Sequence, residues 1–124
     1  MIKALLAVGI GGGLGSMARY AVSYAISKIS SHPFPLATFL INVGGCLLIG
    51  ILFGFTQKNE WMQQYGSLLL ATGFCGGFTT FSTFAFENVM LLERAQFFYA
   101  IIYMMLSLIV GIALCRLGIW LIKG

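Results

Sequence analysis

Aspartate is absent from this 124-residue chain, and its only acidic residues are three glutamates. With seven lysines and arginines, charged residues make up 8% of the sequence, whereas a typical soluble domain has about 25%. So few charges cannot cover the surface of a folded globule, which excludes a soluble monomer. Because 60% of the residues are apolar, a disordered chain is also excluded. An integral membrane protein is the class that remains.

Residue groupings that would bind a metal or a nucleic acid are also missing. The three cysteines stand singly in apolar runs, and the one histidine, His32, has no partner at ligand spacing. We therefore expect neither a zinc site nor a disulfide framework. The basic residues are scattered, several beside apolar runs, and form no patch that fits a phosphate backbone. They are typical of anchors at a membrane interface, with no nucleic-acid partner.

Long apolar runs dominate what is present. They cover residues 4–26, 36–55, 67–86 and 97–122, and each supplies the ~20 helical residues that cross a ~30 Å hydrocarbon core. The runs lack the period-two alternation of membrane strands. Short breaks with turn residues separate them. The sequence predicts an all-α membrane protein with four transmembrane helices, in a single domain over residues 1–124.

Basic residues almost balance across the two sides of such a bundle. One side would hold Lys3, Lys58, Arg116 and Lys123, and the other Arg19, Lys28 and Arg94. Because lysine and arginine near helix ends set the orientation of a membrane protein, this near-equality favours insertion in both directions. We predict a dual-topology, antiparallel homodimer. The alternative is one orientation set by the single extra charge.

The third apolar run is unusual at its centre. Gly76-Gly77 and Thr79-Thr80 weaken the helix where lipid demands a continuous one. Broken helices at that depth are tolerated where they line a cavity or hold an ion, and freed backbone carbonyls suit a cation such as Na⁺. The pattern predicts a third helix broken at mid-membrane.

Two stripes follow helical spacing around this predicted break. The aromatic stripe is Phe78, Phe81 and Phe84, and the polar stripe is Thr79, Thr83 and Glu87. Phenyl edges carry partial positive charge and can stabilise an anion without binding it tightly. Hydroxyl groups of Ser82 and Thr83, and of Tyr103 and Ser107 on the fourth run, can donate hydrogen bonds along the same path. Simple packing is the alternative role of the aromatic stripe.

Two further polar residues lie within the apolar runs. Arg19 either reaches back to the interface or creates a positive potential in an aqueous vestibule. Asn42 shares a helical face with Thr38, and its amide offers two uncharged N–H donors to a partly dehydrated anion. Interhelical hydrogen bonding is the alternative role for Asn42.

At these residues the sequence resembles the Fluc (CrcB) family of small bacterial fluoride channels. The similarity covers essentially the whole chain and rests on residues 12–20 (GGLGSMARY), 38–42 and 76–84 (GGFTTFSTF). Ala37 and Cys46 depart mildly from the family pattern, outside the expected sites.

The resemblance implies fluoride-selective, passive export from the cytoplasm, giving fluoride resistance, through two pores of an antiparallel homodimer in the bacterial inner membrane. It implies a structural Na⁺ on the dimer axis, held by backbone carbonyls of Gly76 and Thr79, and no organic cofactor. Arg19 would feed a vestibule, and Glu87 would lie near an exit. The expected pore residues are Asn42, Phe81, Phe84, Thr38, Ser82, Thr83, Tyr103 and Ser107.

Two other classes are alternatives. A small proton-coupled multidrug exporter requires a carboxylate at mid-membrane, but the only intramembrane candidate, Glu87, stands near a span end. A structural subunit would leave the glycine pair and the aligned polar residues without a purpose. No ATP-binding motif or covalent chemistry is present, so an enzyme is not expected.

Overall fold

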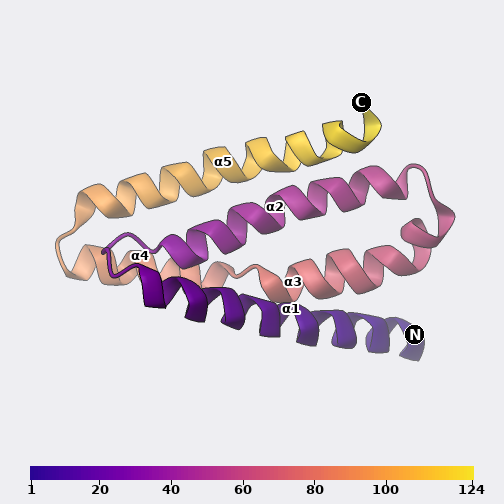
Figure 1. Cartoon of the computed structure of the whole chain (residues 1–124), viewed down its shortest axis with the longest axis horizontal. Coiled ribbons are helices and arrows are strands. Elements are labelled where there is room, and N and C mark those ends of the chain that lie inside the picture. The colour runs from indigo at the N-terminus through magenta and orange to yellow at the C-terminus, as the bar shows by residue number, and fades with distance from the viewer.

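The computed structural model describes residues 1–124 and is entirely helical (Figure 1). Its elements in chain order are α1 (Ile2–Ile29), α2 (Leu36–Thr56), the π-helix η1 (Met62–Cys75), α3 (Gly76–Phe78), α4 (Phe81–Glu93) and α5 (Phe97–Lys123). Four stretches are long and apolar enough to cross a membrane: Ile2–Ile29, Leu36–Thr56, Met62–Glu93 and Phe97–Lys123. The predicted four-helix membrane protein is confirmed. The third stretch is longer than its apolar run because its helices continue through polar residues at both ends.

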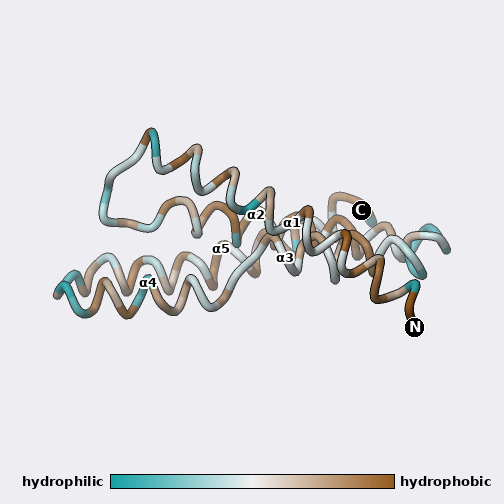
Figure 2. The backbone as a smooth tube through the Cα atoms, turned by 90° about the horizontal axis from the view of Figure 1, so that it is seen from below, coloured by the Kyte–Doolittle hydropathy of each residue, from teal (hydrophilic) through white to brown (hydrophobic).

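The helices form an elongated bundle. In Figure 1, α5 lies beside α2, and α1 lies alongside η1 and α3. Both chain termini and the turn before η1 lie at one end of the bundle, and the turns before α2 and α5 lie at the other. Hydrophilic segments gather mainly at these two ends, with apolar helix between them (Figure 2). This distribution suits a protein whose middle faces lipid.

Glycines set the closest helix contacts. A Cβ atom at Gly15 would collide with the carbonyl oxygen of Phe74, and one at Gly50 with the carbonyl oxygen of Cys115. Gly11 and Gly77 are similarly crowded by the backbones of η1 and α1. The helices approach one another closely at these positions, because only a hydrogen side chain leaves room for the neighbouring backbone.

The third span is interrupted at two residues. Thr79 (φ −83°, ψ 158°) and Thr80 (φ −151°, ψ 123°) are extended, while Gly76 and Gly77 stay helical. The hydroxyl of Thr80 accepts a 3.2 Å hydrogen bond from the backbone N–H of Thr83 and caps α4.

This interruption corrects the two predicted stripes, which assumed one helical register. Phe78 belongs to α3 and stacks on Phe74 with ring centroids 5.8 Å apart. Phe81 and Phe84 belong to α4 and pair separately at 5.9 Å. Thr79 is likewise cut off from Thr83 and Glu87. Two extended residues change the rotation between flanking helices, so spacing counted across them does not predict a common face.

Candidate functional site

Glu87 joins three helices. Its Oε2 accepts a 2.9 Å hydrogen bond from the hydroxyl of Thr38 on α2, and its Oε1 accepts a 2.7 Å bond from the hydroxyl of Tyr103 on α5. Thr38 and Tyr103 are both buried. The carboxyl group is therefore oriented by two donors that are themselves held by packing. Three of the predicted site residues therefore meet here, one from each of α4, α2 and α5.

An aromatic row adjoins this cluster. The ring of Phe84 lies 4.9 Å from the ring of Tyr103 and 5.9 Å from that of Phe81. Phe84 is half-buried, whereas the side chain of Phe81 is 78% exposed. The row thus runs from the buried Glu87 cluster to the open side of the bundle, with rings inclined to one another by 57° and 39°.

Asn42 bridges the interruption in the third span. Its Nδ2 donates a 3.0 Å hydrogen bond to the carbonyl oxygen of Thr80, and its Oδ1 accepts a 2.9 Å bond from the N–H of Thr80. The side chain therefore replaces the helical partners that this extended residue lacks. One N–H of the amide remains for another acceptor.

A cavity of about 430 Å³ opens beside Asn42 and the aromatic row. The site residues along its wall are Asn42, Gly76, Thr79, Phe81, Phe84 and Ser107. The buried hydroxyl of Ser107 has no hydrogen-bond partner. An orphaned hydroxyl is costly in an apolar setting, so this wall contains a buried polar group that lacks a partner.

Ser82 and Thr83 lie at the start of α4. The hydroxyl of Thr80 donates to that of Thr83 over 3.2 Å and lies 3.4 Å from that of Ser82. These hydroxyls gather at the interruption, and Tyr103 and Ser107 stand on α5. The structure thus divides the predicted polar residues between two elements.

Arg19 reaches the interruption from α1. Its Nε donates a 3.1 Å hydrogen bond to the carbonyl oxygen of Gly77. The hydroxyl of Ser16 lies 3.5 Å from the same oxygen. A positive charge here stabilises the carbonyl end of a helix.

The backbone between Gly76 and Thr80 leaves carbonyls free. A continuous helix would bond the Gly76 carbonyl to the N–H of Thr80, but that N–H donates to Asn42. The carbonyl of Thr79 accepts no hydrogen bond within the chain, while its hydroxyl donates to the carbonyl of Cys75 over 2.8 Å. Two hard oxygen ligands are available on this side of the chain.

The sequence patterns did not identify Asn88 as a site residue, although it lies next to Glu87. Its side chain is 6% exposed, its Nδ2 donates a 2.9 Å hydrogen bond to the carbonyl of Phe84, and its Oδ1 has no partner. An amide four residues after Phe84 and adjacent to Glu87 is the signal that would have identified it.

Comparison with known proteins agrees with the resemblance seen in the sequence. The family model described as CrcB-like protein, Camphor Resistance (CrcB), matches residues 6–119. Proteins named fluoride-specific ion channel FluC are similar over nearly the whole chain. That of Azobacteroides pseudotrichonymphae is 43% identical over 95% of this chain and 94% of its own. That of Flavobacterium psychrophilum is 41% identical over 98% of both, and that of Gloeothece citriformis is 44% identical over 96% of both.

The family predicted from the sequence is therefore confirmed, and the expectation that the chain is not an enzyme is confirmed with it. The chain belongs to the CrcB family, a family of ion channels.

Proposed function

We propose that the chain is a fluoride-selective channel that passively exports cytoplasmic fluoride across the bacterial inner membrane. The observation that carries the proposal is the unbroken row from Phe81 through Phe84 to the Tyr103–Glu87–Thr38 cluster. The names of its relatives agree with it. Phenyl edges and hydroxyl donors are the groups that replace the water of a small, strongly hydrated anion.

Selectivity follows from the same groups. Fluoride accepts hydrogen bonds strongly, so its dehydration requires donors along the path, and a narrow path excludes the larger chloride. Several weak sites allow release as well as entry. The expelling force is the interior-negative potential, which supplies ~2.3 kcal/mol per charge per 100 mV.

We further propose that two chains pair antiparallel and enclose two pores. A single chain leaves Phe81 78% exposed and the 430 Å³ cavity open on its side. Lipid would leave the free carbonyls of Gly76 and Thr79 on that wall without partners, whereas a second chain would enclose them. Near-equal basic charge on the two sides is consistent with both orientations.

A structural Na⁺ on the dimer axis completes the proposal. The interrupted helix would then lie at mid-membrane, with carbonyls of Gly76 and Thr79 from each chain as ligands. The free state of these carbonyls within one chain supports this fit. A bound Na⁺ would supply a fixed positive charge at the interface and hold the two copies together.

The test is anion flux from liposomes that contain purified protein. We expect fluoride efflux that makes the membrane potential follow the fluoride gradient, and no comparable chloride efflux. Equal fluxes of the two anions would refute selectivity. Electroneutral exchange of protons for an organic cation would instead indicate a multidrug exporter. That reading is weakened because both oxygens of Glu87 already accept hydrogen bonds.

A further inference from the structure

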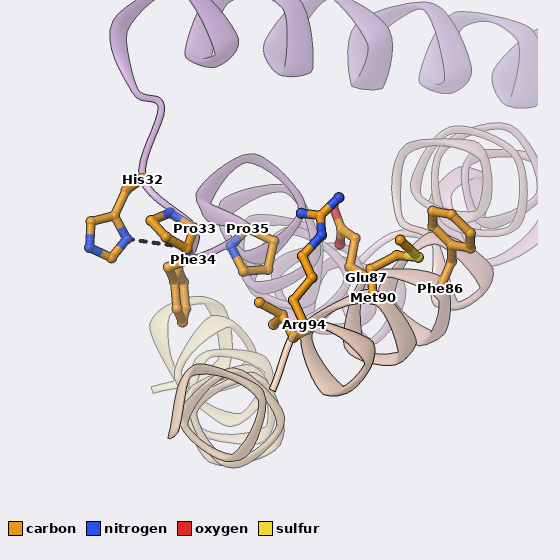
Figure 3. A pocket seen from close by; sticks show the side chains of 9 residues that line it. His32, Pro33, Phe34, Pro35, Phe86, Glu87, Met90 and Arg94 are labelled. Carbon is orange, nitrogen blue, oxygen red and sulfur yellow. Dashed lines mark hydrogen bonds between the residues drawn. The ribbon is translucent and has the colours of Figure 1, made fainter. Parts of the chain in front are cut away.

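The turns before α2 and α5 lie together at one end of the bundle (Figure 1). A second cavity, lined in part by the turn before α2, lies at this end. Its volume is about 320 Å³. It is bounded by the α1–α2 turn, with His32 and Phe34, by Glu87 of α4, and by Arg94, the residue that follows α4 (Figure 3). This space, called the end cavity below, borders the Glu87 cluster on the side away from the helix interruption.

The end cavity contains one carboxyl group and one guanidinium group. Arg94 follows Glu87 by two helical turns, and its side chain extends back along α4 towards that carboxyl group (Figure 3). No carboxylate lies within 4.0 Å of its nitrogens, and no hydrogen bond in the chain involves its guanidinium. Its five N–H donors therefore face the cavity and solvent.

We propose that the end cavity is the aqueous mouth of the fluoride path at Glu87, where Arg94 attracts the anion by offsetting the Glu87 charge. The inference rests on the proposed function. It adds Arg94 as a residue that controls the rate at which a small inorganic anion enters the path.

The physical reason is the sign of the potential at this mouth. With Arg94 present, a carboxylate and a guanidinium share the cavity, and their charges nearly cancel. Without Arg94, the carboxylate alone would repel an approaching anion. For charges separated by roughly 8 Å of water, each unit of charge changes the local anion concentration about two- to threefold. Since salt screens such fields, the effect must fall as ionic strength rises.

The experiment measures initial fluoride efflux from liposomes for R94K, R94Q and R94E. It uses about 0.1 M salt, where the screening length is about 10 Å, and about 1 M salt, where it is about 3 Å. We expect R94K to match the wild type, R94Q to lose about two- to threefold and R94E to lose more at low salt. All differences should shrink at high salt. The matched control is R116Q, which removes an exposed arginine that lines neither cavity.

A double variant separates charge from shape. R94Q combined with Glu87→Gln leaves no net charge at the mouth, so its salt dependence should return to that of the wild type. Gel filtration of each variant checks assembly. Wild-type-like flux from R94Q and R94E would overturn the inference and leave the channel function intact, as would loss of flux in R94K equal to that in R94Q. Wild-type protein without fluoride flux would instead overturn the proposed function.

Discussion

The hydroxyl of Tyr103 donates a 2.7 Å hydrogen bond to Oε1 of Glu87, joining this fully buried side chain of α5 to α4. The same tyrosine ring packs against Phe84. One residue thus couples the carboxyl group to the aromatic row, through its hydroxyl on one side and its ring on the other.

Tyr103→Phe should separate these two roles. The ring stays packed against Phe84, while the donor to Glu87 is lost. A hydrogen bond to a charged group contributes about 1.5–3 kcal/mol, so we expect fluoride flux to fall by roughly tenfold or more. Liposome efflux measures this. Tyr99→Phe is the control, because the Tyr99 hydroxyl makes no hydrogen bond within the chain. Equal flux in wild type and Tyr103→Phe would mean that the hydroxyl does not serve transport.

Phe81→Ile and Phe84→Ile should each reduce fluoride flux while the protein stays assembled. Isoleucine preserves apolar bulk but removes the electropositive ring edge, a contribution of about 0.5–1.5 kcal/mol per aromatic contact. We expect losses of about threefold to tenfold. Phe53→Ile on α2, also partly exposed, should leave flux unchanged. If gel filtration shows that the variants no longer assemble, the two rings serve packing instead.

Asn42→Leu should destabilise the protein as well as impair transport. The substitution leaves the N–H and the carbonyl of Thr80 without partners, at about 1–3 kcal/mol each. We expect a clear fall in the thermal unfolding midpoint in detergent. Asn59→Leu in the exposed α2–η1 turn removes one hydrogen bond to the N–H of Met62 and should shift the midpoint less. An unchanged midpoint in Asn42→Leu would show that other groups satisfy Thr80.

Gly76→Val and Gly77→Ala should fail in different ways. A Cβ atom at Gly77 would collide with the carbonyl of Gly12, so this substitution disturbs the fold of each chain. A Cβ atom at Gly76 meets nothing within 4 Å in its own chain. If a second copy covers this position, Gly76→Val should weaken the dimer and leave the helical content unchanged. Sedimentation measures the strength of the dimer, and circular dichroism measures the helical content. A Gly76→Val dimer of wild-type strength would place the dimer interface elsewhere, and Thr79→Ser should be milder than either glycine variant.

Much of the architecture was predictable because it depends on local composition. Apolar length alone indicates four spans, since a helix must satisfy its backbone within lipid. Glycine spacing alone does not show where helices approach closely: Gly11 and Gly15 are crowded by neighbouring backbone, whereas Gly9 and Gly13, at the same spacing, meet open space. Spacing predicts which residues share a face, and the direction of that face depends on neighbouring helices.

The site was only partly predictable. Thr38, Glu87 and Tyr103 were all expected in the path, but their common hydrogen-bonded cluster joins residues 49 and 16 positions apart. The partner of Asn42 is the backbone of Thr80, which no side-chain pattern indicates. The stripe through Phe78 was wrong because two extended threonines reset the helical register.

By itself, therefore, the sequence determined the membrane class, the four apolar spans and the family, all of which follow from composition and contiguous motifs. The tertiary structure decided which polar groups pair and which remain free, as Ser107 and Arg94 do. Hydrogen bonds act over about 3 Å, so they depend on how α2, α4 and α5 are placed in space. Helical periodicity within one segment carries no information about that placement.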